Sequence, residues 1–413
     1  MTSLWIVTKD IRIRDNLVLK NSLLYSNKVY PVFIIDFDQI SRGGSNSIHF
    51  LFESLQYLHE ELKKIGSCLH IIRKNELQTF INYTQSTKAF ILSGFTEFEI
   101  QRENLYRSLI NLVTIDDCLG VERSLLYKKD GDSYVVFSYF EKHFNDNVKY
   151  KLPEIDYPGD INKCTKFELN SLYDFNYLDL KQFIPKKSDK CLWYGGSNYA
   201  EQLCTNHNRE IELSPYIKFG NISPRIVYHY GNDKQKRGIL WRCFYYILST
   251  KNKLILKNIN IPWRQENSYE FQCWCTGNTG FDYVDAGINQ LLETGIMDNK
   301  LRMLVANFLV FGLCVNWREG ENFFRKHLVD YDWILNLGNW AWSAQVGVDR
   351  PKPNKKFGNK TIRVFNPDTY MTKTADERNF RNSYINKWLR RNNGFVNKIC
   401  NFEYNSSIML NYF

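Results

Sequence analysis

The first 125 residues alternate short apolar runs with amphipathic stretches, and this alternation constrains the fold more than any other feature of the chain. The longest amphipathic stretch, residues 50–65, carries leucines at positions 51, 55, 58 and 62, which is the spacing of a helix with one buried face. The apolar runs are residues 4–7, 31–36, 68–72, 89–92 and 112–115. Alternating strands and helices predict an α/β domain over residues 1–125, a Rossmann-like parallel sheet covered by helices.

The rest of the chain has a different pattern. Residues 126–190 are rich in Lys, Asp, Asn, Tyr and Pro and lack sustained periodicity, which predicts an interdomain connector that packs against both domains. After Trp193 the strand signal largely vanishes, and residues 283–294, 301–315 and 321–328 have helical spacing. Because 413 residues are enough for two cores, we expect an all-α second domain over residues 191–413.

Charge and the N-terminus bear on partners and location. Residues 189–413 hold 30 Lys and Arg against 20 Asp and Glu, whereas residues 1–188 hold 24 of each. A basic half favours contact with a polyanion, but a generally basic surface explains it equally well. No signal peptide and no run of about 18 apolar residues is present. We expect a soluble, intracellular, monomeric protein of the cytoplasm or nucleus, without a membrane partner.

The ten cysteines are scattered along the chain. Only Cys273 and Cys275 lie close together, without a second pair or histidines at zinc spacing. Reduced structural thiols and no metal site are therefore expected.

Six of the ten tryptophans fall between positions 263 and 342. The same stretch holds Arg302, Asp330, Asp332 and Asn336. Oxidisable indoles beside charges in apolar surroundings suggest redox chemistry on a bound aromatic cofactor, although Trp is also a large core residue that needs one hydrogen-bond partner.

Two Ser-Pro steps, Ser214-Pro215 and Ser223-Pro224, each fit a helix start, with the hydroxyl as N-cap and Pro at the first helical position. The free N–H groups and positive dipole end of a helix start can hold a phosphate. Capping alone is the simpler explanation.

Five ordered motifs carry a family resemblance. They are residues 213–225, 240–245, 277–286, 316–321 and 330–342, and their order and spacing resemble the FAD-binding domain of the photolyase/cryptochrome family. Residues 4–36 resemble that family's N-terminal domain, so the resemblance spans nearly the whole chain. It implies a bound FAD, to which the protein supplies binding, orientation and electronic tuning.

The resemblance also assigns FAD contacts. Arg302 and Asp330 take the places of a salt bridge beside the flavin, and Asp332 lies near the adenine and ribose. Asn336 stands where the family places the residue that faces flavin N5; the repair members carry this amide, which can both donate and accept. An amide that caps a turn is the alternative. The implied set is Tyr199, Leu213, Ser214, Arg242, Arg302, Asp330, Tyr331, Asp332 and Asn336.

Trp340, Trp317 and Trp263 match the family's chain of three tryptophans, which passes an electron from the surface to photoexcited flavin. Hopping between neighbouring indoles replaces one long, slow transfer. Trp263 is the weakest match, because the stretch from it to Trp274 is one residue longer than usual. With Asn336 these three form the implied catalytic set; three core tryptophans are the alternative.

A base dimer flipped out of a duplex needs aromatic walls and polar contacts. Trp241 and Trp342 resemble the walls of the family's lesion pocket, and Asn299 and Met303 resemble the contacts of cyclobutane-dimer photolyases. Tyr245 is assigned to the same surface. The paired histidines that mark (6-4) photolyases are absent from residues 298–303.

A basic run follows Trp342. Residues 349–363 hold six Lys and Arg against one Asp. We expect Lys355, Lys356 and Lys360 to contact backbone phosphates of DNA, although a solvated basic loop explains the run too.

The chain departs from the family pattern at several positions. Gly238 replaces a glutamate that bonds the damaged base, and Cys243 replaces an acidic residue. Glu210 and Ile211 replace a phosphate-binding Thr-Ser pair. A carboxylate beside a phosphate repels it, so Ser214 and Arg242 are the candidate phosphate ligands.

The chain is identified as a member of the photolyase/cryptochrome family, closest to the class I-like bacterial type. The implied function is light-driven repair of cyclobutane pyrimidine dimers in UV-damaged DNA by electron transfer from reduced FAD. The alternatives are a cryptochrome-type photosensor, favoured by Gly238, and a nucleic-acid-binding relic without flavin, favoured by Glu210 and Ile211. Phe98-Glu99 with Arg102-Glu103 resembles the lining of an antenna cleft for folate or deazaflavin, but charges at a helix start explain it equally well.

Overall fold

The computed structural model describes residues 1–36, 40, 43–166, 196, 200, 204, 213–255, 261–349, 362–390 and 397–412. The chain divides into two compact units, residues 1–187 with 192–251, and residues 188–191 with 252–413. The described helices up to residue 251 therefore belong to the first unit. The domain boundaries at residues 125 and 190 stay predictions.

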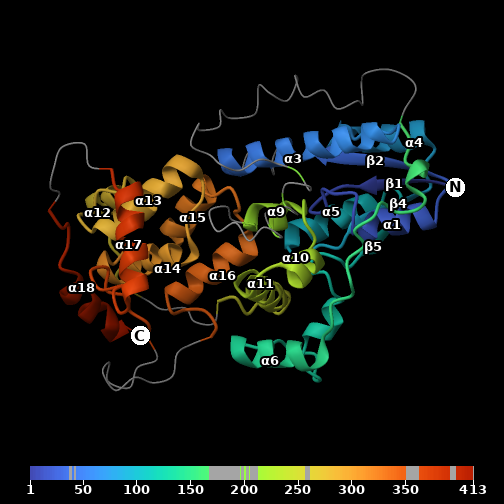
Figure 1. Cartoon of the computed structure of the whole chain (residues 1–413). Helices are drawn as coiled ribbons and strands as arrows, with labels where there is room; N and C mark the ends of the chain where they lie inside the picture. Colours follow the sequence, from blue (N-terminus) through green and yellow to red (C-terminus); the bar gives the residue numbers. More distant parts are fainter. Residues whose placement is uncertain are drawn as a thin grey trace. The chain divides into compact units, whose positions relative to one another are not determined.

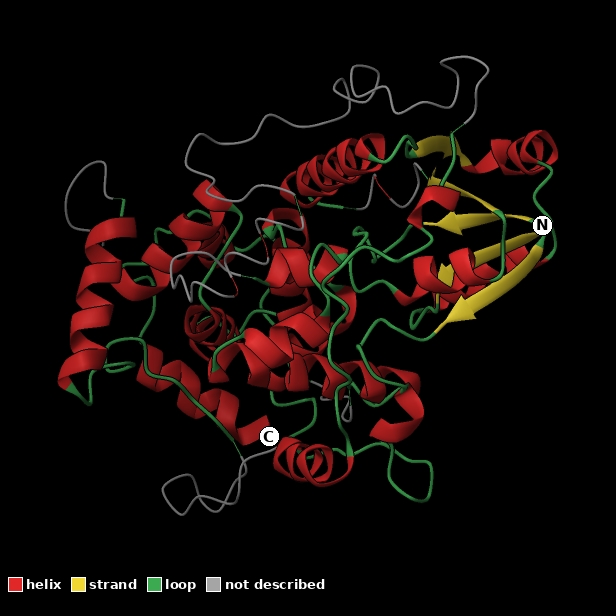
Figure 2. Cartoon of the chain, turned by 45° about the vertical axis from the view of Figure 1, so that its right-hand side comes forward, coloured by secondary structure: helices red, strands yellow, loops and turns green. Residues whose placement is uncertain are grey.

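A parallel five-stranded sheet organises the first unit, with strand order β3-β2-β1-β4-β5 (Figures 1 and 2). Leu4 on the central strand lies opposite Tyr30 on one side and Ala89 on the other. The strands are β1 Thr2–Ile6, β2 Lys28–Ile35, β3 His70–Arg73, β4 Lys88–Leu92 and β5 Asn111–Ile115. The predicted α/β fold is confirmed, and the strands are apolar runs because parallel sheets are buried on both faces.

Helices connect the strands, as the alternation predicted. The apolar face of α3 buries Leu55, Leu58 and Leu62, three of the four leucines that indicated this helix. The helices of this part are α1 Leu17–Leu24, α3 Ser45–Lys64, α4 Leu77–Thr84 and α5 Glu97–Arg107, with short 3-10 turns η1 Lys74–Glu76, η2 Arg123–Leu126 and η3 Ile161–Lys163.

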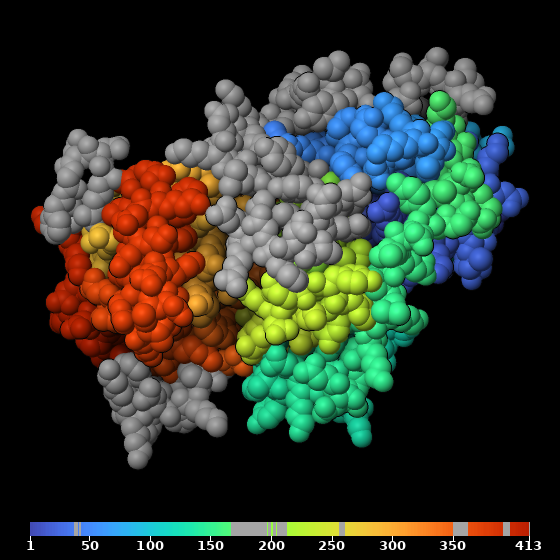
Figure 3. Space-filling model, viewed as in Figure 1, coloured from blue at the N-terminus to red at the C-terminus, as the bar shows by residue number. Residues whose placement is uncertain are grey.

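The expected irregular connector contains a helix, α6 Phe137–Asn147. It buries Phe137, Phe140 and Phe144, and the Phe140 ring lies 5.6 Å from that of Phe244 on α11. Figure 3 shows α6 and α11 packed side by side. The prediction of an irregular segment is wrong here, because three phenylalanines at helical spacing are enough to bury one face despite the polar residues between them.

Three further helices complete the first unit: α9 Ser214–Phe219, α10 Pro224–Tyr230 and α11 Asp233–Thr250. A buried charge network joins α10 to the loops of the sheet. The guanidinium of Arg225, 4% exposed, donates to both carboxylate oxygens of Asp15 at 2.9 and 3.0 Å, and to both of Asp117. These carboxylates hold the pKa of Arg225 above its ordinary value against the effect of burial, so it stays charged. We call Arg225, Asp15 and Asp117 the Arg225 network.

In the second unit, the described elements of secondary structure are all helices. The predicted helix over residues 301–315 is observed as α14, continued by a π-helical turn as far as Gly312, and the one predicted over 321–328 begins earlier, at Trp317. The helices are α12 Tyr269–Cys275, α13 Asp282–Thr294, α14 Asn299–Asn307, η4 Phe308–Gly312, α15 Trp317–His327, α16 Trp333–Ser343, α17 Ala375–Trp388, α18 Phe402–Met409 and η6 Leu410–Tyr412. The predicted all-α second part is confirmed. Among the described residues, no helix has the length and apolar character needed to cross a membrane.

Candidate functional site

An ion pair in the second unit brings Arg302 and Asp330 together, as the resemblance implied. Nη2 of Arg302 donates to Oδ2 of Asp330 at 2.9 Å, and Nε of Arg302 donates to the carbonyl of Met297 at 2.8 Å. The Asp330 side chain is 5% exposed and that of Arg302 is 24% exposed. Oδ1 of Asp330 is buried and makes no hydrogen bond to a described residue. This carboxylate therefore keeps one acceptor for a further group.

Asp332 begins α16 two residues later. Its carboxylate accepts hydrogen bonds from the backbone N–H groups of Ile334 and Leu335 at 3.1 and 3.2 Å, which makes it the N-cap of the helix. Capping fixes the direction of the first turn of α16, on which Asn336 lies.

Asn336 is buried and bonded to α15. Its Nδ2 donates to the carboxylate of Glu321 at 2.9 Å and to the backbone carbonyl of Glu321 at 3.2 Å. The hydroxyl of Tyr331 donates to the same Glu321 oxygen at 3.1 Å. Burial, and the Glu321 carboxylate next to it, raise the pKa of Tyr331 well above its ordinary value, so the hydroxyl remains a donor. The alternative role of Asn336, capping a turn, is not what these contacts show.

The tryptophans of the second unit occupy different surroundings. Trp340 is 2% exposed, and its ring contacts Phe324 at 5.0 Å and Trp274 at 6.4 Å, both edge to face. Trp317 is buried at the start of α15, with the Arg318 guanidinium 4.7 Å from its ring centre. Trp263 is partly buried and packs against the same core. All three therefore belong to one apolar core, which is compatible with either role considered for them.

Trp241, on α11 of the first unit, is stacked. Its ring lies face to face with that of Phe137, 3.7 Å apart and 3° from parallel, and the Arg237 guanidinium lies 5.4 Å from the Phe137 ring. Tyr245, one turn further on, is 1% exposed. Phe137 therefore covers one face of Trp241 and fixes its orientation. Gly238, one turn before Trp241, is exposed, and a Cβ added there would meet no atom within 4 Å.

Arg242 points into the first unit. It is 4% exposed, and its Nη2 donates to the hydroxyl of Tyr246 at 2.8 Å and contacts Sγ of Cys118 at 3.7 Å. Cys243, the departure from the family's acidic residue, is fully buried, and burial raises the pKa of its thiol to about 12. It therefore remains a neutral packing residue.

The two Ser-Pro steps behave differently. Ser223 is the N-cap of α10, accepting from the N–H of Ile226 at 3.2 Å, as predicted. The prediction of Ser214 as an N-cap is wrong: α9 begins at Ser214 itself after Leu213, and the buried Ser214 Oγ makes no hydrogen bond to a described residue. Its hydroxyl therefore stays available to another group. Tyr199, Glu210 and Ile211 lie outside the described residues.

The residues assigned to DNA are described in part. Asn299 and Met303 are neighbours on α14, with Nδ2 and Sδ 4.0 Å apart. The Arg363 guanidinium lies 4.4 Å from the ring of Trp342, whose buried Nε1 has no hydrogen-bond partner among the described residues. Lys355, Lys356 and Lys360 lie outside the described residues.

The charged residues before and within α5 hold a turn. Glu99 forms a capping box with Thr96 and an ion pair with Lys9 at 2.7 Å, while Glu103 accepts from the backbone N–H of Gly94. Burial opposes ionisation of Glu99, but the charges of Lys9 and Arg102, together with hydrogen bonds from Lys9 and the backbone of Phe95, offset it and lower the pKa. Helix-start charges therefore explain this motif; an antenna role stays a prediction.

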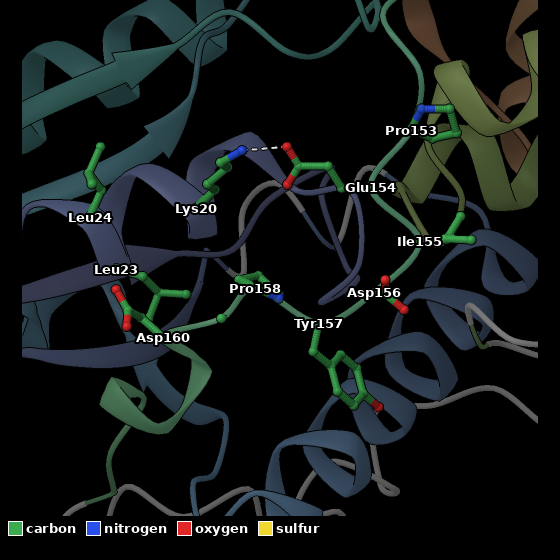
Figure 4. Close-up of a pocket in the computed structure, with 11 residues that line it drawn as sticks. Lys20, Leu23, Leu24, Pro153, Glu154, Ile155, Asp156, Tyr157, Pro158 and Asp160 are labelled. Carbon is green, nitrogen blue, oxygen red and sulfur yellow. Dashed lines mark hydrogen bonds and ion pairs between the residues drawn. The ribbon is translucent and has the colours of Figure 1, made fainter.

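A surface pocket of about 560 Å³ lies between α1 and residues 153–160, and none of the predicted site residues lines it (Figure 4). Lys20 and Glu154, which both line the pocket, form an ion pair, and both side chains are 49% exposed. Because water screens exposed charges, these two side chains would contribute little binding energy to a charged ligand.

Two of the residues assigned to FAD each have a buried polar atom that a bound FAD could satisfy, so their chemistry fits this cofactor. Asp330 Oδ1 in the second unit and Ser214 Oγ in the first are buried without a described partner. Burying a polar atom in this way costs about 1–3 kcal/mol unless a ligand or water satisfies it. A carboxylate oxygen accepts from sugar hydroxyls, and a serine hydroxyl donates to phosphate. No group of three or more potential metal ligands occurs among the described residues.

Glu321 was given no role in the expectations drawn from the sequence, although it lies in the motif of residues 316–321. Its contact with Asn336 depends on how α15 packs against α16. Fifteen residues separate the two, so spacing alone gave no signal.

Comparison with known proteins agrees with this picture. Residues 3–158 match the DNA photolyase family, and residues 235–408 match the FAD binding domain of DNA photolyase. A deoxyribodipyrimidine photo-lyase of Buchnera aphidicola is 28% identical over 91% of this chain and 86% of its own length. A cryptochrome DASH of Synechocystis is 26% identical over 92% of this chain and 86% of its own.

A solved structure gives the same result. An archaeal photolyase from Sulfolobus tokodaii, crystallised with two FAD molecules, superposes with a TM-score of 0.82 at 27% identity, covering 100% of this chain and 99% of that one. The predicted resemblance is confirmed, and the chain belongs to the photolyase/cryptochrome family.

Proposed function

We propose that the protein repairs cyclobutane pyrimidine dimers in DNA, using light and reduced FAD. The observation that carries the proposal is Asn336, the amide implied for the repair members, bonded to Glu321 in the same unit in which Asp330 keeps one buried acceptor unused. The relative from Buchnera aphidicola is named deoxyribodipyrimidine photo-lyase, as are relatives from Alkalihalophilus pseudofirmus and Agrobacterium fabrum at the same 28% identity, which supports repair.

The residues of this chain have separate tasks in the proposal. Arg302, Asp330, Asp332 and Asn336 bind and orient FAD, with Ser214 and Arg242 as phosphate ligands. When bound, reduced FAD would supply an electron after absorbing light, and the electron would return once the two inter-base bonds of the dimer had broken. Trp241 and Trp342 stack on the flipped dimer, and Asn299 and Met303 make further contacts with it. The role predicted for Tyr245 at this surface is not kept, because its side chain is 1% exposed.

Trp340, Trp317 and Trp263 serve a second task, restoring the reduced state of the cofactor. The buried position of Trp340 supports its place as first donor, because an indole shielded from water transfers an electron with little solvent reorganisation. A Trp340→Phe change is expected to slow photoreduction while repair by chemically reduced protein stays intact. Equal loss of both would contradict this division.

Gly238 favours a second candidate function, a photosensor that binds FAD without repair, because it removes a carboxylate that would bond the damaged base. The test illuminates chemically reduced protein with a thymine-dimer oligonucleotide and follows the ultraviolet absorbance that intact thymines regain. Recovery of the thymine absorbance in the light but not in the dark supports the repair enzyme. If the FAD-loaded protein restores no absorbance in the light, the result supports the sensor. A colourless protein that takes up no FAD would support the third alternative, the relic.

The antenna is a separate proposal. Folate and deazaflavin remain the expected chromophores, and the two FAD molecules of the Sulfolobus tokodaii relative add FAD to them. Chromatography of the chromophores extracted from the purified protein would distinguish folate, deazaflavin and FAD.

A further inference from the structure

The contacts of Asn336 fix which end of its amide faces outward. Nδ2 donates to two oxygens of Glu321, one on its side chain and one on its backbone. Both partners can only accept, since one is a carboxylate and the other a carbonyl. The amide nitrogen must therefore lie on this side, and Oδ1 takes the opposite side, where no described residue donates to it.

Glu321 is itself held in place. The Tyr331 hydroxyl donates to the same Oε1 at 3.1 Å, so Oε1 receives two hydrogen bonds from two different residues. Tyr331 and Asn336 lie on either side of the N-cap of α16. The Glu321 carboxylate therefore ties α15 to the start of α16 at two points.

Close packing of the two helices makes this contact reachable. A Cβ added at Gly320 would lie 2.1 Å from Cη2 of Trp340, so only glycine allows α15 to approach α16 this closely. Glu321 follows Gly320 directly, which brings its carboxylate within 2.9 Å of the Asn336 amide.

We propose that Glu321 is a positioning residue that locks Asn336 with Oδ1 outward, so that this side chain accepts from flavin N5 and cannot donate to it. The inference rests on the proposed function, because Asn336 faces N5 only if FAD is bound as proposed. Flavin N5 carries a hydrogen when FAD is reduced and offers only a lone pair when it is oxidised. A locked acceptor therefore binds reduced FAD better than oxidised FAD.

Two substitutions of Glu321 distinguish the effect of its hydrogen bond to Asn336 from the effect of its negative charge. Glu321→Asp keeps the negative charge but is one methylene too short to reach Nδ2, so only the backbone carbonyl at position 321 still holds the amide and its orientation is less fixed. Glu321→Gln removes the charge but keeps an oxygen at the same reach. The readout is the midpoint potential of bound FAD measured in the dark by equilibration with redox dyes, which reports relative affinity for the two forms and needs no repair assay.

The expected result is that Glu321→Asp shifts the preference for reduced over oxidised FAD about fivefold towards the oxidised form, the effect of one hydrogen bond. Glu321→Gln shifts this preference less than Glu321→Asp does. Tyr331→Phe keeps the carboxylate but removes one of its two hydrogen bonds, and it shifts the preference in the same direction as Glu321→Asp. In an Asn336→Ala background the Glu321→Asp shift disappears, because Glu321 then has no amide to orient.

A Glu321→Asp shift that persists in the Asn336→Ala background would overturn the inference, as would a larger shift in Glu321→Gln than in Glu321→Asp. In both cases Glu321 acts through its charge. If the wild-type protein binds FAD and repairs dimers while all these potentials coincide, only the inference fails. If it binds no FAD in either state, the proposed function fails as well.

Discussion

Each unit of the molecule buries a cluster of opposite charges, and the two clusters differ in how completely their atoms are used. In the Arg225 network all five N–H groups of the guanidinium have acceptors. Oδ1 of Asp15 accepts from the backbone of Glu154 as well, and Oδ2 accepts from Ser223. In the second unit, the pair of Arg302 and Asp330 leaves Oδ1 of Asp330 without a described partner.

This difference separates a structural cluster from a binding one. A buried charge cluster with every atom satisfied cannot take a ligand without breaking a bond it already has. A cluster with one buried acceptor unused carries a desolvation cost that a ligand can remove. The Arg225 network therefore joins α10 to the sheet loops, whereas Asp330 keeps one acceptor for the group that we propose it binds.

The largest expected effect is on stability. Arg225→Met leaves two carboxylates buried without a counter-charge and should lower the free energy of unfolding by about 3–5 kcal/mol. The matched control is Arg237→Met, which breaks an exposed pair with Glu141 in the same unit and should cost less than about 1 kcal/mol. Urea unfolding followed by circular dichroism measures both. Equal costs would mean that the network does not hold the unit together.

The second effect is on cofactor affinity. Asp330→Asn keeps the size of the side chain but turns one of its two acceptors into a donor, so either Arg302 or the ligand loses its partner. FAD should bind about tenfold more weakly, as expected for one charge-assisted hydrogen bond. Equilibrium dialysis with FAD gives the affinity. Glu293→Gln, the same chemical change at the exposed pair with Arg390, should leave it unchanged; a similar loss there would point to a general effect of charge.

The sheet was more predictable than either cluster. Buried parallel strands are apolar runs whatever surrounds them, so β1 to β5 followed from local sequence. The helix α6 was missed because only Phe137, Phe140 and Phe144 mark its buried face. Ser214 was misassigned because a Ser-Pro step fits both the N-cap and the first helical position. The contact between Glu321 and Asn336 could not be predicted from the sequence, because it depends on how α15 and α16 pack against each other.

Some of the residues assigned from the resemblance can be compared with the structure, and the roles of others cannot. Arg302 and Asp330 are paired as implied, because the pair had a direct counterpart in the family. The roles given to the tryptophans and to the DNA contacts stay predictions, since burial of an indole fits both a core residue and an electron donor.

The third effect concerns Gly238 and is the smallest. Because a Cβ there meets no atom within 4 Å, the position accepts a side chain at its Cβ, and Gly238→Glu restores the family carboxylate. It should raise the repair rate about fivefold, the contribution of one hydrogen bond to the damaged base. Gly238→Ala is the control: it gains about 0.5–1 kcal/mol of helix stability without a carboxylate and should leave repair unchanged. Equal rates for both variants would remove Gly238 from the lesion surface.

Hydrogen exchange of the protein with and without FAD tests the contrast between the two clusters most directly. FAD is predicted to slow exchange at residues 330–336, where Asp330 gains a partner and the start of α16 becomes fixed. The backbone amides around Asp15 and Asp117 should exchange at the same rate in both states, since the Arg225 network is complete on its own. Unchanged exchange at residues 330–336 in an FAD-saturated sample would contradict the account.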